Sequence, residues 1–60
     1  MRVTLEHPDR PPREMEIHAQ GRMLIQPHYD DRGRLCEEQY EWVSPSRARY
    51  ARTRVVEDPA

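Results

Sequence analysis

Apolar and polar residues alternate in two N-terminal stretches of the chain, residues 2–7 and 14–20. Alternation with a period of two residues is typical of strands that bury one face. We therefore predict a strand in each stretch. The apolar faces of these strands carry Val3, Leu5, His7, Met15, Ile17 and Ala19. Between them, residues 7–13 hold three prolines, which excludes a helix or a central strand, so we predict a surface connection there.

Two further stretches, residues 23–29 and 34–43, flank a turn signal at residues 30–33, Asp-Asp-Arg-Gly. Aspartate favours the first position of a type I turn, and glycine accepts a positive φ at its end. Glutamates and helical spacing in residues 34–43 leave a helix as the alternative there, but the match with the preceding stretch favours a strand. We therefore predict a β-hairpin.

The length of its loop sets the register of the hairpin. A four-residue loop pairs Tyr29 with Arg34 and collects the large apolar side chains on one core face. These side chains are Met23, Ile25, Tyr29, Cys36, Tyr40 and Trp42. A three-residue loop would slip the register by one residue and oppose Met23 to Glu41. We therefore expect the four-residue loop.

A three-residue loop at residues 20–22 continues the same apolar face into the preceding strand. Residues 47–56 follow Ser-Pro-Ser, which fits a helix start as well as a turn between strands. The fold class that we predict is mostly β, a small twisted antiparallel meander of four or five strands, with residues 47–56 as a strand or a short C-terminal helix. We expect residues 1–56 to form a single domain and residues 57–60 to form a frayed tail.

The length of 60 residues limits the core. A domain of this size buries only about 60% of its unfolded surface, so it gains from burial against a second molecule. Cys36 is the single cysteine, which excludes an internal disulfide and fits a reducing compartment. We find neither a membrane-spanning apolar run nor the apolar segment of a secretion signal. We therefore expect a cytoplasmic protein without membrane contact.

The stretch HYDDRGRLC, residues 28–36, raises the question of a metal site. A zinc site needs about four ligands in recognisable spacings, and here one cysteine accompanies three widely spaced histidines. The expected register also places His28 and Cys36 on opposite faces of the sheet. No nucleophile–base pattern, phosphate-binding loop or dinucleotide motif occurs. We therefore expect no metal, no cofactor, no catalytic residue and no enzymatic activity.

Charge is unevenly distributed, although the whole chain carries only −1. Residues 28–43 hold five acids and two arginines, whereas residues 44–56 hold four arginines and no acid. Arginines around an aromatic residue are typical of a nucleic-acid-binding surface. Cross-strand pairing with the acidic segment explains the same charges, and a net charge of −1 is unlike a nucleic-acid-binding domain. This candidate basic site comprises Arg47, Arg49, Tyr50, Arg52 and Arg54.

A second candidate site lies on the outward face of the expected hairpin, where Leu24, Leu35 and Val43 stand among polar residues. An exposed apolar patch is the usual mark of a protein contact. The alternative is that residues 47–56 fold across this patch and cover it.

Together these features predict a small non-enzymatic protein-binding module, an inhibitor or adaptor that acts by occupying a surface. Its partner is another protein or a second copy in a homodimer. The alternative is an arginine-dependent nucleic-acid-binding regulator that uses the basic site. In size and composition the chain resembles small accessory proteins of phages and mobile elements, although it shares no motif with them.

Overall fold

A computed structural model gives the fold of residues 1–57, and residues 58–60 are not described. The described part contains five strands and no helix. In chain order these are β1 (Arg2–His7), β2 (Arg10–Glu16), β3 (Met23–Tyr29), β4 (Leu35–Ser44) and β5 (Arg47–Glu57). The predicted mostly β fold is confirmed. Of the tail predicted at residues 57–60, Glu57 ends β5 and the remaining residues lie outside the described part.

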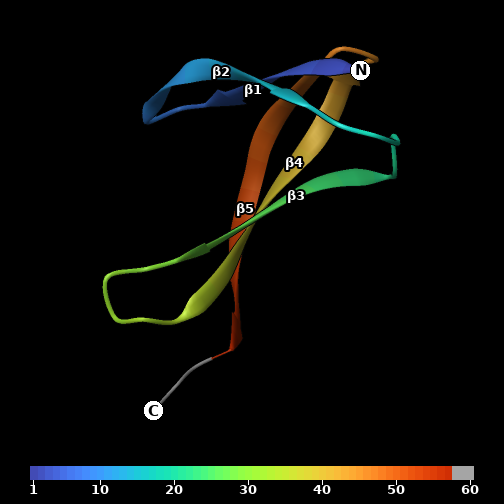
Figure 1. Ribbon diagram of the computed structural model, residues 1–60. Coiled ribbons are helices and arrows are strands. Elements are labelled where there is room, and N and C mark those ends of the chain that lie inside the picture. The colour runs from blue at the N-terminus through green and yellow to red at the C-terminus, as the bar shows by residue number, and fades with distance from the viewer. Residues whose placement is uncertain (58–60) are drawn as a thin grey trace.

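The five strands form one mixed sheet in the order β2-β1-β5-β4-β3, which curves into a half-barrel (Figure 1). β4 runs antiparallel to both β3 and β5, and β1 and β2 form an antiparallel hairpin. β1 runs parallel to β5, however, and this pairing joins the two units. The expected antiparallel meander is therefore wrong. So is a C-terminal helix, because the last segment is the central strand of the sheet.

β2 begins at Arg10, inside the segment for which the sequence predicted a surface connection. The prolines are tolerated because β2 is an edge strand and because Pro11 and Pro12 lie in a bulge, where neither has a register partner on β1. Pro11 and Pro12 are exposed, and Met15 packs against the core as expected. β2 and β3 lie at opposite edges of the sheet, so the hairpin loop predicted at residues 20–22 is wrong.

The β3–β4 hairpin has the three-residue loop that the apolar pattern disfavoured. The N–H of Asp30 donates to the carbonyl of Arg34, and the N–H of Gly33 donates to the carbonyl of Asp30, both at 3.0 Å. With a φ of 78° at Gly33, this is a type I turn followed by a glycine bulge. The Asp30 carboxylate stabilises it, because Oδ1 accepts the N–H groups of Arg32 and Arg34, each at 2.9 Å.

The register of β3 is consequently one residue away from the expected one. Met23 lies opposite Glu41, and Leu24 lies opposite Tyr40. Because a slip of one residue moves every side chain to the other face, Leu24 turns inward and Met23 and Ile25 turn outward. The hydrogen bonds and backbone conformation of the turn therefore decide which face of β3 is buried, although the other face carries more apolar residues.

The core lies on the inner face of the half-barrel. Its buried residues are Val3, Leu5, Leu24, Cys36, Tyr40 and Ala48. The inward positions of Tyr40 and Cys36 are confirmed. Trp42 is half-buried against this core, and its Nε1–H donates to the carbonyl of Gly21 at 2.8 Å, which fastens the β2–β3 connection. His28 pairs with Cys36, so their expected separation on opposite faces is wrong.

Candidate interaction surfaces

The four arginines of β5 lie on the outer face of the sheet, opposite the buried side of that strand. The odd spacing between Arg49 and Arg52 would normally place these two side chains on different faces. A register shift after Gln39 leaves Ala51 without a partner, and this irregularity restores both arginines to one face. The arginines therefore form a continuous row along β5.

Neighbouring strands supply partners for this row. The contacts are Arg47 to Glu6 at 2.9 Å, Arg52 to Gln39 at 2.6 Å and Arg54 to Glu37 at 3.6 Å. Arg49 lies in register between Glu6 of β1 and Glu41 of β4. Acidic residues thus lie on both sides of the arginine row, and they reduce its positive electrostatic potential at the surface.

Tyr50 lies apart from these arginines, on the inner face. Its ring centroid is 4.3 Å from that of His7 and 5.9 Å from that of Tyr40, and its hydroxyl lies 2.7 Å from the hydroxyl of Thr53. The structure therefore divides the candidate basic site, with arginines on one face and the aromatic ring on the other. Stacking of a base on Tyr50 beside the arginines is not possible in this arrangement.

The predicted apolar patch is also divided. Leu24 is only 6% exposed and belongs to the core, so its expected outward position is wrong; the three-residue loop is the cause. Leu35 is half-buried, and Val43 is 47% exposed at the opposite end of β4. Since Leu35 and Val43 are separated by most of the strand, they do not form one patch by themselves.

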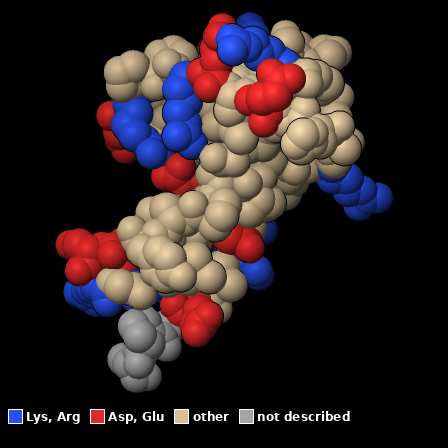
Figure 2. Space-filling model, in the orientation of Figure 1, with Lys and Arg blue, Asp and Glu red and all other residues tan. Residues whose placement is uncertain are grey.

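A different apolar surface takes its place, which we call the outer band: Met23, Ile25, Tyr29 and Leu35. Ile25 is 39% exposed and Tyr29 is 72% exposed. β3 carries no Asp, Glu or Arg, and Figure 2 shows an uncharged strip along it with charged groups gathered at its ends. The sequence pattern had assigned Met23, Ile25 and Tyr29 to the core, and only the loop length reverses this assignment.

The end of the outer band contains a hollow of about 220 Å³ lined by Tyr29, Gly33, Leu35 and Glu57. Leu35 pairs with Tyr29 on one side and with Glu57 on the other, so the three side chains face the same way. The hollow thus combines an aromatic ring, an aliphatic side chain and a carboxylate. Aromatic residues in such positions often anchor protein interfaces.

The free edge of β3 is guarded against strand pairing. Asp30 directs its N–H to β4, so alternation turns the backbone nitrogens of Tyr29, Pro27 and Ile25 away from β4. Pro27 has no N–H to offer at that edge. The side-chain amide of Gln26 donates to the carbonyl of Ile25 at 3.0 Å. Both features hinder the addition of a strand from another molecule.

The inner face contains a polar cluster around Glu38, which is 8% exposed. Its Oε1 accepts the Tyr40 hydroxyl at 3.0 Å, its Oε2 accepts Arg10, and His7 Nε2 lies 3.8 Å away. Burial alone would raise the pKa of Glu38, but the hydrogen bonds from Tyr40 and Arg10 and the charge of Arg10 hold it below 4.5. Burial, then the bond to Glu38, raises the pKa of Tyr40.

Sequence reasoning missed this cluster although the signal was present. Glu38 falls in the same alternation as Cys36, Tyr40 and Trp42, so the period of two places it inward with them. A buried carboxylate needs donors, and one of them, Arg10, lies in the part of β2 for which the sequence predicted a surface connection.

Comparison with known proteins found no match, whether with family models, curated proteins or solved structures. Within residues 1–57 no helix is long and apolar enough to cross a membrane. The same residues bring together no group of three or more His, Cys, Asp or Glu side chains suited to holding a metal ion.

Proposed function

We propose that this protein is a non-enzymatic protein-binding module, an inhibitor or adaptor that covers part of a partner's surface with its outer band. The observation that carries the proposal is the exposure of Met23, Ile25 and Tyr29 on one uncharged strand. Burying such apolar area stabilises a complex by roughly 25 cal/mol per Å² before the cost of association. A protein surface is the partner that offers matching apolar area.

The guarded edge of β3 favours docking on the face of the sheet over addition of a strand. Pro27 and the Gln26 amide occupy the hydrogen-bonding positions that an added strand would need. At the β2 edge, Pro11 and Pro12 are exposed as well. In the outer band, by contrast, the side chains of Met23, Ile25 and Tyr29 are exposed.

The hollow beside Tyr29 indicates the chemistry of the partner. A lysine or arginine side chain has an apolar stem that fits against Tyr29 and Leu35, and a cationic end that meets the carboxylate of Glu57. We therefore propose that the partner inserts one basic side chain here, while its apolar surface covers Ile25 and Met23.

The nucleic-acid alternative has less support. Three of the four arginines on β5 already have side-chain partners, and Tyr50 faces inward. Phosphate binding would have to compete with these contacts. It remains the alternative outcome of the experiment below.

The test compares two exposed-surface variants in capture experiments from a lysate of the source cells, with and without nuclease. Ile25→Glu with Tyr29→Glu charges the outer band, and Arg49→Glu with Arg52→Glu reverses the basic row. We expect one or more proteins to be retained by wild type and by the basic-row variant, to be lost with the band variant, and to be insensitive to nuclease. Retention by the band variant, or loss with nuclease, contradicts the proposal. Light scattering on purified protein identifies a second copy as the partner if wild type dimerises and the band variant does not.

A further inference from the structure

A small pocket on the inner side of the half-barrel carries an uncompensated positive charge. It lies beside the β1–β2 hairpin, measures about 30 Å³, and is lined by Leu5, His7, Arg10, Pro11, Arg13 and Tyr40. One water molecule needs about 10–15 Å³ in this measure, so the pocket admits a small group with about two oxygen-sized atoms. The pocket is on the opposite face from the outer band, so it is independent of the function proposed above.

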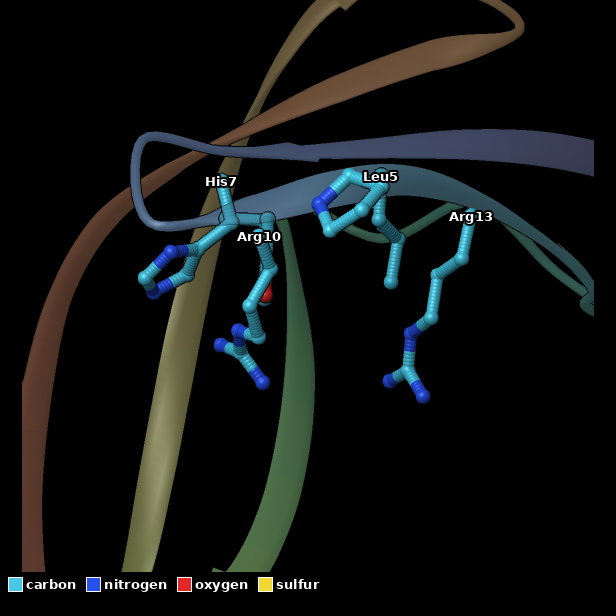
Figure 3. A pocket seen from close by; sticks show the side chains of 6 residues that line it. Leu5, His7, Arg10 and Arg13 are labelled. Carbon is cyan, nitrogen blue, oxygen red and sulfur yellow. The ribbon is translucent and has the colours of Figure 1, made fainter.

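A bulge in β2, where Pro11 and Pro12 lie opposite the single residue Glu6 of β1, brings two arginines into this pocket. Arg10 and Arg13 are three residues apart, and a regular strand would point them to opposite faces. The register shifts between Leu5 and His7, so that Arg13 lies opposite Leu5 and Arg10 lies opposite His7. Figure 3 shows both arginine side chains extending from β2 in the same direction.

The charges of the two arginines are satisfied differently. Arg10 pairs with Glu38, whose carboxylate also accepts the hydroxyl of Tyr40. Arg13 donates to Oε1 of Gln26 at 3.0 Å, which is a neutral amide, and within residues 1–57 it forms no ion pair. The two arginines and the Glu38 carboxylate together carry a surplus of one positive charge.

We propose that this pocket binds a carboxylate group, held mainly by Arg13. A carboxylate is a planar monoanion that accepts two parallel N–H bonds from one guanidinium, and its charge matches the surplus of one. A phosphate monoester carries a charge of about −1.5 to −2 and would leave part of it unmatched. Leu5, Pro11 and Tyr40 supply apolar walls that limit competition from water. The carboxylate comes from a small organic acid or from an acidic side chain of a polypeptide.

The test is a titration of the isotope-labelled protein near pH 7 at constant ionic strength, followed by nuclear magnetic resonance. The probes are acetate, N-acetyl-aspartate amide and methyl phosphate, and the signals are the Nε–Hε group of Arg13 and the backbone amides of Leu5 and Tyr40. We expect saturable shifts with acetate and the capped aspartate, and weaker binding of methyl phosphate. Tighter binding of the capped aspartate than of acetate identifies a polypeptide side chain as the source.

Variants separate a site from general attraction of anions. Arg13→Gln should weaken acetate binding about tenfold or more, read from the amides of Leu5 and Tyr40. Arg2→Gln is the matched control, because Arg2 is an exposed outer-face arginine paired with Glu14, and it should leave the titration unchanged. Shifts that do not saturate, that persist in Arg13→Gln, or that are stronger with methyl phosphate overturn the proposal.

Discussion

Tyr40 shows how a single residue serves both the apolar core and its polar cluster. Its ring is among the largest fully buried side chains, and its hydroxyl donates to Glu38 at 3.0 Å. The carboxylate is therefore buried without being left short of donors, since no buried side-chain N or O atom in the described residues lacks a partner. Removing one donor should expose how strongly the cluster depends on it.

We expect Tyr40→Phe to lower the free energy of unfolding by about 1.5–3 kcal/mol, because the buried, charged carboxylate of Glu38 then loses one of its hydrogen bonds. Tyr50→Phe is the matched control: its hydroxyl bonds to the exposed Thr53, and its loss should cost less than about 1 kcal/mol. Urea denaturation followed by the fluorescence of Trp42 measures both. If both variants lose the same free energy of unfolding, the hydrogen bond from Tyr40 to Glu38 contributes no more to stability than an exposed one.

Acid should weaken the fold through the same carboxylate. The pKa values of Glu38 and Asp30 lie below their ordinary values of 4.5 and 3.8. Groups with lowered pKa stabilise the fold above the ordinary pKa, and this contribution is lost as the pH falls through the lower value of the folded state. Stability should therefore decline below about pH 4.5, and Glu38→Gln should flatten that decline. Glu14→Gln, at an exposed position, is the control and should keep the wild-type slope; a Glu38→Gln profile as steep as wild type would contradict this expectation.

At the scale of the elements, the sequence pattern predicted β1, β3 and β4 to within one residue and predicted the pairing of β3 with β4. It placed β2 four residues too late and missed the parallel pairing of β1 with β5. β3 has the predicted bounds, and β4 is displaced by only one residue from the prediction. The apolar set suggested the wrong hairpin register because Met23, Ile25 and Tyr29 outnumber Leu24. The local hydrogen bonds of Asp30 and the positive φ of Gly33 fix the loop length instead, and these depend on backbone geometry that hydrophobic pattern does not encode.

The face of the sheet on which the arginines of the candidate sites lie depends on irregularities in the strands. The bulge at Ala51 aligns the arginines of β5, and the bulge at Pro11 and Pro12 in β2 aligns Arg10 with Arg13. A single bulge reverses the face of every residue after it, and alternation read from a sequence assumes that there is none. The parallel contact between β1 and β5 is likewise a long-range pairing that no local signal marks.

The edge of β3 gives a test at this scale. Pro27→Val restores an N–H that points away from β4, and valine suits a strand better than proline. We expect this variant to self-associate more than wild type, visible as a rise of mean mass with concentration in light scattering. Pro45→Val, in the exposed β4–β5 turn, is the control and should behave like wild type. If Pro27→Val also keeps the wild-type mass at every concentration, Pro27 does not protect this edge.

For the whole molecule, the half-barrel separates two kinds of surface. Its inner side is filled by the core and the Glu38 cluster, while the outer side presents the outer band beside rows of paired charges. A chain of 60 residues forms only a small core, so its free energy of unfolding is small. Apolar residues left exposed on β3 add nothing to this stability unless a second molecule covers them. This is the reason to expect that the protein works in contact with another protein.

Site-specific photocrosslinking in the source cells tests that claim most directly. A photoreactive phenylalanine derivative replaces Tyr29 in one variant and Arg49 in a second, both at exposed outer-face positions that keep the core intact. We predict discrete protein adducts from position 29 that disappear when Ile25→Glu is added, and few or none from position 49. Adducts to nucleic acid, or protein adducts from position 49 but not from position 29, would contradict it.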